Sequence, residues 1–508
     1  APSKVKEAVI KEVAEEVKDM IYSSKAMPDY AVDMVFTEFA ILLEKAKDSL
    51  IAARAADLRD VRNRVLRILK GEKEQNLANL REKVVVVAHD LLPSDTATLD
   101  RSHVMGIVTE VGGATSHTAI IARSYKIPAV LGVPEATEIM QNGDMIVLDA
   151  LKGQVLLEPE RATISEYEVK LEEFLKSEKQ TAEYLGRIPL VASGERFSVG
   201  LNIGSTEPDE GFKYVDFVGL FRTEFLYMES EHMPTEDEQF AAYKKVLANA
   251  MGNPVTLRTL DIGGDKSLRY LVLPKEDNPF LGNRALRLCL DMPDMFRTQL
   301  RAALRASAFG PMQIMFPMVG TIDDVRAGNA AVEAVKAELR AEGIPFDEKI
   351  KVGIMIEIPS IAMIADLAAK ETDFASVGTN DLTQYLHAVD RMNPKLITYY
   401  QSSSPAMFRI LGKIFKEYNE ANKQVSVCGE LAGEPLAAIV LFGLGLRKFS
   451  MNASNIAHVK RMLSLFTLAE TEEIAEKVVN MDTQAYVEAF LKAEVAKREQ
   501  KQTATAKN

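Results

Sequence analysis

From about residue 190 onward, the sequence repeats one pattern about eight times: a short apolar run is followed by a helical pattern. The apolar runs are FSVGLNIG, FVGLFRTEF, VTLRTLDIGG, IMFPMV, VGIMIEIP, FASVGTNDL, QVSVCGELAG and KFSMNAS. Continuous apolar runs are typical of parallel strands that are buried on both faces and joined by crossover helices. Since eight such units close into a barrel, the sequence predicts a (β/α)8 barrel.

Polar or charged residues follow nearly every one of these predicted strands. They are Asn202, Arg222, Arg258, Glu357, Asn380, Asp381, Cys428 and Asn452. In a parallel barrel the carboxyl ends of all strands meet at one mouth, where the connecting loops build the active site. We therefore expect the chemistry of this chain among these residues.

The residues before the barrel divide into three further parts. Residues 1–75 carry helical patterns throughout and predict a helical subdomain. Residues 76–160 contain the β-branched runs KVVVVAH, HVMGIVTE and DMIVLDA, which predict a small α/β domain. Residues 161–188 predict a highly charged helical linker, and residues 189–508 complete the chain as the barrel. The predicted fold class is α/β.

Composition excludes several classes of protein. The chain has 508 residues, 47% of them hydrophobic and 26% charged, and contains no apolar run of about 18 residues that could span a membrane. A net charge of −12 disfavours a large nucleic-acid surface. The two cysteines are too few for a disulfide framework, which favours a cytoplasmic location.

Three arginines, Arg222, Arg258 and Arg391, lie on different segments of the predicted mouth, and Arg284 follows nearby. A single arginine is more often a surface or ion-pair residue. Several guanidinium groups at one mouth match phosphate and carboxylate oxygens two at a time, so they indicate a small, multiply anionic substrate. The stretch DIGGDK adds Lys266 and a glycine pair whose backbone amides could approach an anion.

Glu357 and Asp381 end adjacent predicted strands, which puts two carboxylates on one rim. Mg²⁺ takes one or two protein carboxylates and completes its coordination with water and phosphate oxygens, so the pair predicts a magnesium site. The alternative is that one carboxylate neutralises an arginine. Cys428 is a candidate proton donor, although a buried, inert cysteine is the commoner case.

The stretch GGATSHTAIIAR places His117 just inside a predicted helix start, after a turn at Gly112 and Gly113 and the hydroxyls of Thr115 and Ser116. Backbone amides at such a start favour negative charge. An imidazole that attacks phosphorus becomes an anionic phosphohistidine, which this environment can stabilise. The alternative is a structural histidine.

Eight stretches together resemble enzyme I of the bacterial phosphoenolpyruvate:sugar phosphotransferase system. They are GGATSHTAIIARS, GLFRTEFLYM, RTLDIGGDK, NPFLGNRALR, IEIPS, VGTNDLTQY, AVDR and CGELAG, in this order. The resemblance covers nearly the whole chain. Related dikinases share single motifs but carry a nucleotide-binding domain for which this chain has no room.

This resemblance implies that the α/β domain is a swivelling phosphohistidine domain and that His117 is phosphorylated. It implies that the barrel binds phosphoenolpyruvate with Mg²⁺ and dimerises. By position, Glu357 and Asp381 match the metal ligands, Arg222, Arg258 and Arg391 match residues that hold phosphate and carboxylate, and Asn380 matches a further substrate contact. Cys428 matches the acid that converts the enolate to pyruvate, and the phosphoryl group passes on to the phosphocarrier protein HPr.

One departure leaves alternatives open. Family chains begin with a stretch like S-P-G-I-A and two long helices that form much of the carrier-docking surface, whereas Ala1 falls inside that region. We therefore expect a fragment or a processed chain; if the chain is complete, docking of HPr is doubtful, whereas binding of phosphoenolpyruvate is not. The alternatives are a shortened phosphoenolpyruvate-utilising enzyme with another acceptor, and a phosphoenolpyruvate sensor.

Overall fold

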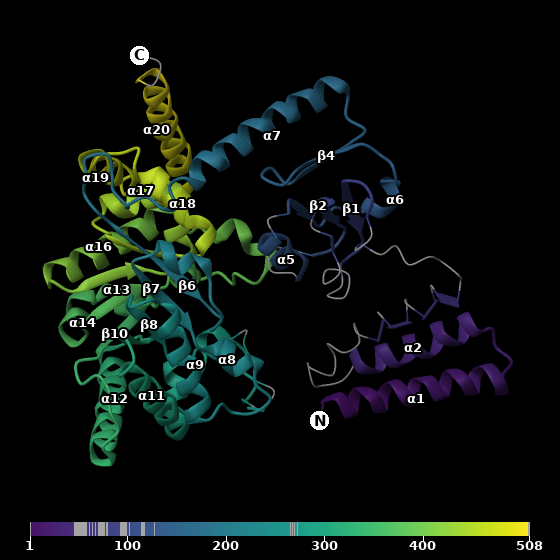
Figure 1. Cartoon of the computed structure of the whole chain (residues 1–508), viewed down its shortest axis with the longest axis horizontal. Coiled ribbons are helices and arrows are strands. Elements are labelled where there is room, and N and C mark those ends of the chain that lie inside the picture. The colour runs from purple at the N-terminus through teal and green to yellow at the C-terminus, as the bar shows by residue number, and fades with distance from the viewer. Residues whose placement is uncertain are drawn as a thin grey trace. The chain divides into compact units, whose positions relative to one another are not determined.

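The protein is represented by a computed structural model (Figure 1). The structure describes residues 2–44, 58–59, 61–62, 65–66, 68–69, 77, 80–91, 99–100, 102–112, 117–125, 127–264, 266, 268, 270–271 and 273–505. The chain forms two compact units, Ala1–Glu172 and Glu173–Asn508. The division falls within helix α7 (Arg161–Ala182), so this helix belongs partly to each unit.

The first unit begins with two long helices, α1 (Pro2–Ser23) and α2 (Pro28–Glu44). Pro28 is the first residue of α2, a position where the missing N–H of proline is not needed. Buried apolar side chains hold the pair together; they are Val13, Val17, Ala31, Val32, Val35, Phe36, Ala40 and Leu58. The described residues 58–59, 61–62, 65–66 and 68–69 of the predicted helical subdomain are also helical.

The α/β part of the first unit contains a three-stranded parallel sheet in the order β1-β2-β3 and a two-stranded antiparallel sheet of β4 and β5. The elements are β1 (Val84–Ala88), β2 (Val104–Thr109), α5 (His117–Tyr125), β3 (Ala129–Leu131), α6 (Ala136–Ile139), β4 (Ile146–Asp149) and β5 (Gln154–Leu157). The three predicted runs correspond to β1, β2 and β4. β3 and β5, which have only three and four residues, were not predicted from the sequence.

Eight parallel strands of the second unit close into a barrel in the order β6-β7-β8-β9-β10-β11-β12-β13, with β13 paired to β6 (Figure 1). They are β6 (Ser198–Ile203), β7 (Phe217–Arg222), β8 (Val255–Arg258), β9 (Met312–Phe316), β10 (Lys351–Ile356), β11 (Phe374–Val377), β12 (Gln424–Val427) and β13 (Lys448–Met451). Each of the eight predicted runs forms one of these strands. The predicted (β/α)8 barrel, a TIM barrel, is confirmed.

Helices connect the strands and surround the barrel. The α-helices are α8 (Glu224–Glu229), α9 (Glu236–Asn249), α10 (Leu286–Asp291), α11 (Pro293–Ser307), α12 (Ile322–Glu342), α13 (Pro359–Met363), α14 (Ala365–Glu371), α15 (Thr379–Leu386), α16 (Pro405–Glu420), α17 (Pro435–Gly443), α18 (Ile456–Leu463), α19 (Leu468–Val478) and α20 (Gln484–Thr505). Short 3₁₀ helices are η1 (Glu210–Tyr214), η2 (Pro279–Leu281), η3 (Pro394–Tyr399), η4 (Glu430–Gly433) and η5 (Ala453–Asn455).

The barrel strands bury side chains on both faces. One large apolar cluster joins the strands to the surrounding helices, and a second, small cluster consists of Leu220, Met315, Met355, Phe374 and Cys428. Successive side chains of a strand point to opposite faces, so strands that pack on both sides read as continuous apolar runs. This explains the pattern in the sequence. The domain boundaries at residues 75, 160 and 188 stay predictions.

Within the residues described above, no helix is both long enough and apolar enough to cross a membrane.

Candidate active site

The carboxyl ends of the barrel strands bring the predicted site residues of the second unit to one mouth. Arg222 and Arg258 are the last residues of β7 and β8, which pair in register at these two positions. Glu357 and Cys428 directly follow β10 and β12. Asp381 lies in the first turn of α15, just after β11. The parallel arrangement predicted from the sequence therefore gathers these residues.

Arg258 lies in a buried network of charges. Its guanidinium donates to Glu224 and forms an ion pair with Asp261 at 3.0 Å. Lys266 joins the same two carboxylates, with its Nζ at 2.8 Å from Glu224 and 3.4 Å from Asp261. Burial raises the pKa of Asp261, but Arg258, Lys266 and Arg284 outweigh it and hold this pKa well below its usual range. These carboxylates are ionised and fix the cations in place.

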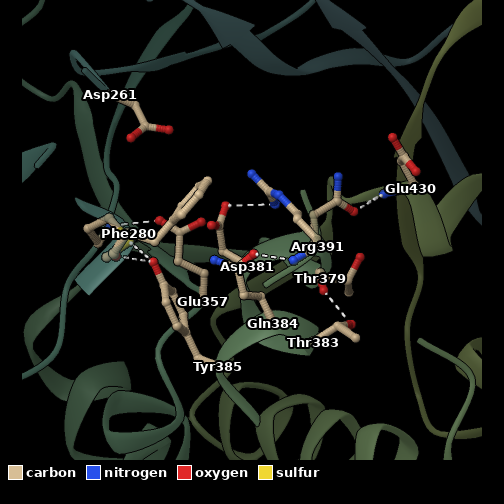
Figure 2. Close-up of polar contacts among 12 residues, drawn as sticks. Asp261, Phe280, Glu357, Thr379, Asp381, Thr383, Gln384, Tyr385, Arg391 and Glu430 are labelled. Carbon is tan, nitrogen blue, oxygen red and sulfur yellow. Dashed lines mark hydrogen bonds and ion pairs between the residues drawn. The ribbon is translucent and has the colours of Figure 1, made fainter. Parts of the chain in front are cut away.

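Asp381 lies between two arginines. Its Oδ1 is 3.3 Å from Arg284 and its Oδ2 is 3.4 Å from Arg391. Arg284 also donates to Asp261 at 2.9 Å, so it links Asp381 to the network around Arg258. Figure 2 shows Asp381 between Glu357 and Arg391, with Asp261 to one side of this group.

Arg222 differs from the other arginines of the mouth. Among the described residues, its guanidinium has no ion-pair partner within 4.0 Å, whereas Arg258 and Arg284 each contact two carboxylates. Burial, and then the positive charge of Arg258, lower the pKa of Arg222. A partly buried cation without an ion-pair partner is destabilising by itself and becomes favourable when an anion binds.

Glu357 is a buried carboxylate, only 1% exposed, that accepts a hydrogen bond from the backbone N–H of Met318 at 2.7 Å. Burial and the nearby negative charge of Asp381 raise the pKa of Glu357 to about 8. A cation between the two carboxylates would relieve this repulsion. In the described part of the chain, no group of three or more His, Cys, Asp or Glu side chains could hold a metal ion, so such a cation would draw further oxygens from substrate or water.

Cys428 and Asn380 complete the mouth. The Cys428 thiol is 2% exposed, and its Sγ lies 3.7 Å from the carbonyl oxygen of Val377. Burial raises the pKa of this thiol to about 11, so it carries its proton at neutral pH and can act as an acid. The Oδ1 of Asn380 accepts a hydrogen bond from the backbone N–H of Glu430 at 3.0 Å, which fixes the orientation of the amide.

Gly263, the first residue of the glycine pair in DIGGDK, lies close to Arg284. Gly263 has φ +107°, and a Cβ there would lie 2.5 Å from the Cβ of Arg284. The amide N–H of Gly263 donates to the carbonyl oxygen of Lys266, and the amide of Lys266 donates back. The amide of Gly263 is thus already paired. This turn instead returns Lys266 to the carboxylates of Glu224 and Asp261.

His117 is the first residue of α5, as predicted. Gly112 has φ +109°, which fits the predicted turn. Residues 113–116 and the side chain of His117 lie outside the described part of the structure, so the roles expected for Gly113, Thr115 and Ser116 stay predictions. His117 belongs to the first unit and the arginines to the second.

Three contributors to the mouth were not singled out from the sequence. Glu224 and Asp261 hold Arg258, and the Tyr385 hydroxyl lies 3.3 Å from Arg284. Glu224 follows Arg222 in GLFRTEF, and Asp261 follows Arg258 in RTLDIGG. This spacing alone does not identify the partner, because Glu224 follows Arg222 but pairs with Arg258.

Comparisons with known proteins identify the class to which this chain belongs. The family model "PEP-utilising enzyme, PEP-binding domain" matches residues 178–467, and "PEP-utilising enzyme, mobile domain" matches residues 80–153. The class is therefore that of the phosphoenolpyruvate-utilising enzymes.

Curated relatives define the family further. A phosphoenolpyruvate-protein phosphotransferase of Priestia megaterium is 45% identical over 95% of this chain and 84% of the relative. Proteins of the same name from Geobacillus stearothermophilus and Bacillus subtilis (strain 168) are 44% and 43% identical over 95% of this chain. The chain belongs to the phosphoenolpyruvate-protein phosphotransferase family, as its motifs predict. A solution structure described as Enzyme I is 44% identical, covers 32% of this chain and 66% of that chain, and has a TM-score of 0.28, too low to support a structural argument.

Proposed function

We propose that this protein transfers the phosphoryl group of phosphoenolpyruvate to His117, releases pyruvate, and then passes the phosphoryl group to a histidine of the phosphocarrier protein HPr. The relatives carry the name of this activity. The observation that carries the proposal is Arg222, a partly buried guanidinium without an ion-pair partner in the described structure, beside the paired cations Arg258 and Lys266. This arrangement suits a substrate that brings several negative charges.

Arg222, Arg258 and Arg391 hold the phosphate and carboxylate of phosphoenolpyruvate in this proposal, and Asn380 supplies a further contact. Guanidinium groups bind such oxygens in pairs, which gives orientation as well as affinity. Phosphoryl transfer depends mainly on placing the donor in line with its acceptor and on neutralising charge. Fixed cations in a buried mouth supply both requirements.

Glu357 and Asp381 are the proposed ligands of Mg²⁺. Burial and the neighbouring charge of Asp381 raise the pKa of Glu357, and a bound cation would lower this pKa again. The raised pKa is the observation that supports a metal site here. When bound, Mg²⁺ supplies positive charge that neutralises substrate oxygens. Asp381 also forms ion pairs with Arg284 and Arg391. It therefore links the proposed metal site to the arginines of the mouth.

Cys428 is the proposed acid. Loss of the phosphoryl group leaves the enolate of pyruvate, and carbon 3 of this enolate must gain a proton. A thiol with a pKa of about 11, raised chiefly by burial, is protonated at neutral pH and therefore available as the donor.

His117 is the proposed acceptor within the chain. Direct transfer requires that its imidazole reach the substrate in the barrel. The α/β part matches a family model described as a mobile domain, which supports this requirement.

We also propose that the protein is cytoplasmic and dimerises through its barrel. Its proposed parts are the helical subdomain 1–75, the phosphohistidine domain 76–160, the linker 161–188 and the barrel 189–508.

Transfer to HPr is the step that separates this proposal from its alternatives. The protein is incubated with phosphoenolpyruvate labelled at phosphorus, Mg²⁺ and HPr, and the label on each protein is followed after separation. The proposal expects label on HPr that depends on His117. Label that stays on this chain would indicate another acceptor, and binding of phosphoenolpyruvate without any label would indicate a sensor.

A further inference from the structure

Gln299 is a buried polar side chain behind the mouth of the barrel. It belongs to α11, which packs against α9 on the outside of the barrel (Figure 1). Only 1% of its surface is exposed. A buried amide destabilises the fold unless its donors and its acceptor are paired, so its partners show which parts of the chain it holds.

The amide of Gln299 contacts the chain just beyond two strand ends. Its Oε1 accepts a hydrogen bond from the backbone N–H of Leu260 at 2.8 Å, and its Nε2 donates to the Oγ1 of Thr223 at 3.2 Å. Thr223 directly follows Arg222, the last residue of β7. Leu260 lies two residues after Arg258, the last residue of β8. One side chain therefore bridges the two segments that carry these arginines.

The bridge lies where the pairing of β7 with β8 ends. Arg222 and Arg258 are the last paired positions of the two strands. Thr223 has φ −70° and ψ −21°, so the chain has already turned toward α8. The Thr223 hydroxyl donates to the carbonyl oxygen of Arg258 at 2.8 Å. Side-chain hydrogen bonds thus continue the connection between the two segments beyond the strand ladder.

The hydrogen bonds allow the Gln299 amide only one orientation. A backbone N–H can only donate, so Leu260 requires Oε1 on its side and leaves Nε2 for Thr223. Nε2 also donates to the hydroxyl of Tyr243 at 3.2 Å, and this hydroxyl donates to Gln239 at 2.9 Å. Both donors and the acceptor of the amide are therefore paired, and the bridge is fixed in place.

The two carboxylates that pair with Arg258 directly follow the bridged residues. Glu224 comes after Thr223, and Asp261 comes after Leu260. A shift of either segment would therefore also move a carboxylate that holds Arg258.

We propose that Gln299 is a positioning residue for substrate binding, because it fixes the distance between Arg222 and Arg258. This role rests on the proposed function, in which the two guanidinium groups hold phosphoenolpyruvate. Gln299 acts through Thr223 and Leu260 and does not itself contact the substrate. Guanidinium groups bind phosphate and carboxylate oxygens with a defined geometry, so their spacing decides whether both can engage one small substrate.

The test is a double-mutant cycle. The measured quantity is the second-order rate constant of pyruvate release in the first turnover, which needs no acceptor other than this chain. Gln299→Met keeps the length of the side chain, removes its hydrogen bonds, and should lower this constant by about tenfold or more. In Arg222→Met the spacing of the two arginines no longer matters, so the addition of Gln299→Met should lower the constant by less than about twofold.

Arg301→Met is the matched control, because it makes the same replacement in the same helix. Arg301 pairs with Glu236 and Glu338 on the outer helices and does not contact either strand end. Its rate constant should stay near the wild-type value.

Thr223→Val is a second variant that breaks the same bridge. It keeps the shape of the side chain and removes the hydroxyl that joins Gln299 to Arg258. It should reproduce the loss in the wild-type background, and it carries the cycle with Arg222→Met if Gln299→Met does not fold.

A wild-type rate constant in Gln299→Met and Thr223→Val would overturn the positioning role and leave the proposed function intact. An equal loss in the Arg222→Met background, or in Arg301→Met, would also overturn it, because the loss would then not depend on the spacing of the arginines. Absence of pyruvate release by the wild-type protein would overturn the proposed function, and the positioning role with it.

Discussion

At the scale of single residues, Arg222 and Arg258 differ in how the protein balances their positive charges. Arg258 is held by Glu224 and Asp261, which stabilise its charge when no substrate is bound. Arg222 has no such ion pair within the described structure, and burial lowers its pKa. The protein therefore fixes Arg258, and in the proposed function the substrate supplies the ion-pair partner of Arg222.

Replacement of Arg222 should lower the activity of the protein without lowering its stability. Arg222→Met removes a desolvated charge, so the melting temperature should stay the same or rise, because active-site charges are often retained at the expense of stability. The kcat/KM for phosphoenolpyruvate should fall by about a hundredfold or more, since a buried charge pair with the substrate is lost. Differential scanning calorimetry and a pyruvate-release assay measure the two effects.

Arg301 provides the matched control. It is also largely buried but contacts Glu236, Glu338 and Glu342 on the outer helices. Arg301→Met should lower stability by about 2 kcal/mol because charged hydrogen bonds are lost, and kcat/KM should stay near the wild-type value. A strongly destabilised Arg222→Met would contradict our reading of Arg222.

Glu357 should make stability depend on pH in the absence of metal. Its folded pKa of about 8, raised by burial and Asp381, lies above its ordinary value of 4.5. Between pH 4.5 and pH 8 the folded state therefore binds more protons than the unfolded state. Glu357 contributes to stability below pH 4.5, and this contribution is lost as the pH rises through 8.

Urea unfolding in EDTA at several pH values tests this expectation. The stability of Glu357→Gln relative to wild type should increase from pH 5 to pH 8, because the variant avoids the buried charge. A difference that does not change with pH would mean that Glu357 ionises normally. Added Mg²⁺ should stabilise the wild-type protein at pH 8 more than Glu357→Gln.

At the scale of elements, the loop after β12 and the start of α15 fit together closely. A Cβ at Gly429 would lie 2.5 Å from the backbone nitrogen of Thr379 and still closer to its Oγ1. Gly429 directly follows Cys428, and Thr379 directly precedes Asn380. The absence of a side chain at Gly429 thus sets the separation between the proposed acid and the proposed substrate contact.

Gly429→Ala should push these two elements apart. We expect a loss of about 1–3 kcal/mol in unfolding free energy from overpacking. We also expect a decrease in kcat that exceeds the change in affinity for phosphoenolpyruvate, because Cys428 moves relative to the substrate. Gly186→Ala is the control, since a Cβ there meets nothing within 4 Å. Equal effects of the two substitutions on kcat would refute this account of Gly429.

The strands of the barrel could be predicted from the sequence, whereas most contacts between their side chains could not. The eight apolar runs predicted the barrel because strands buried on both faces leave a strong local pattern. β3, with only Ala129–Leu131, leaves almost none. Glu224 and Arg258 are 34 residues apart, so their contact depends on the pairing of β7 with β8 and not on any local pattern. The arginines of the site could be predicted because they are cationic residues at strand ends. The carboxylates that neutralise them could be identified only from the folded structure.

At the scale of the whole molecule, the proposed activity divides between two units. The acceptor His117 lies in the unit Ala1–Glu172, and the proposed substrate-binding residues lie in Glu173–Asn508. Each unit has its own apolar core, since the clusters around Val35 and Ile107 involve only the first unit and the large barrel cluster only the second. Substrate binding and phosphoryl acceptance should therefore be separable by substitution.

His117→Ala should leave binding of phosphoenolpyruvate unchanged and abolish pyruvate release. Isothermal titration with Mg²⁺ measures the first property and a coupled pyruvate assay the second. His103→Ala is the control in the same unit, because His103 pairs with Asp100 at 2.7 Å and has no proposed role in transfer. Pyruvate release by His117→Ala would show that another group, or water, accepts the phosphoryl group.

The most direct test of the central claim is to mix the protein with phosphoenolpyruvate labelled at phosphorus and Mg²⁺, and to locate the acid-labile label by peptide mass. We expect label on His117, with one pyruvate released for each phosphoryl group retained. Label on any other residue, or binding of phosphoenolpyruvate with neither label nor pyruvate, would contradict it.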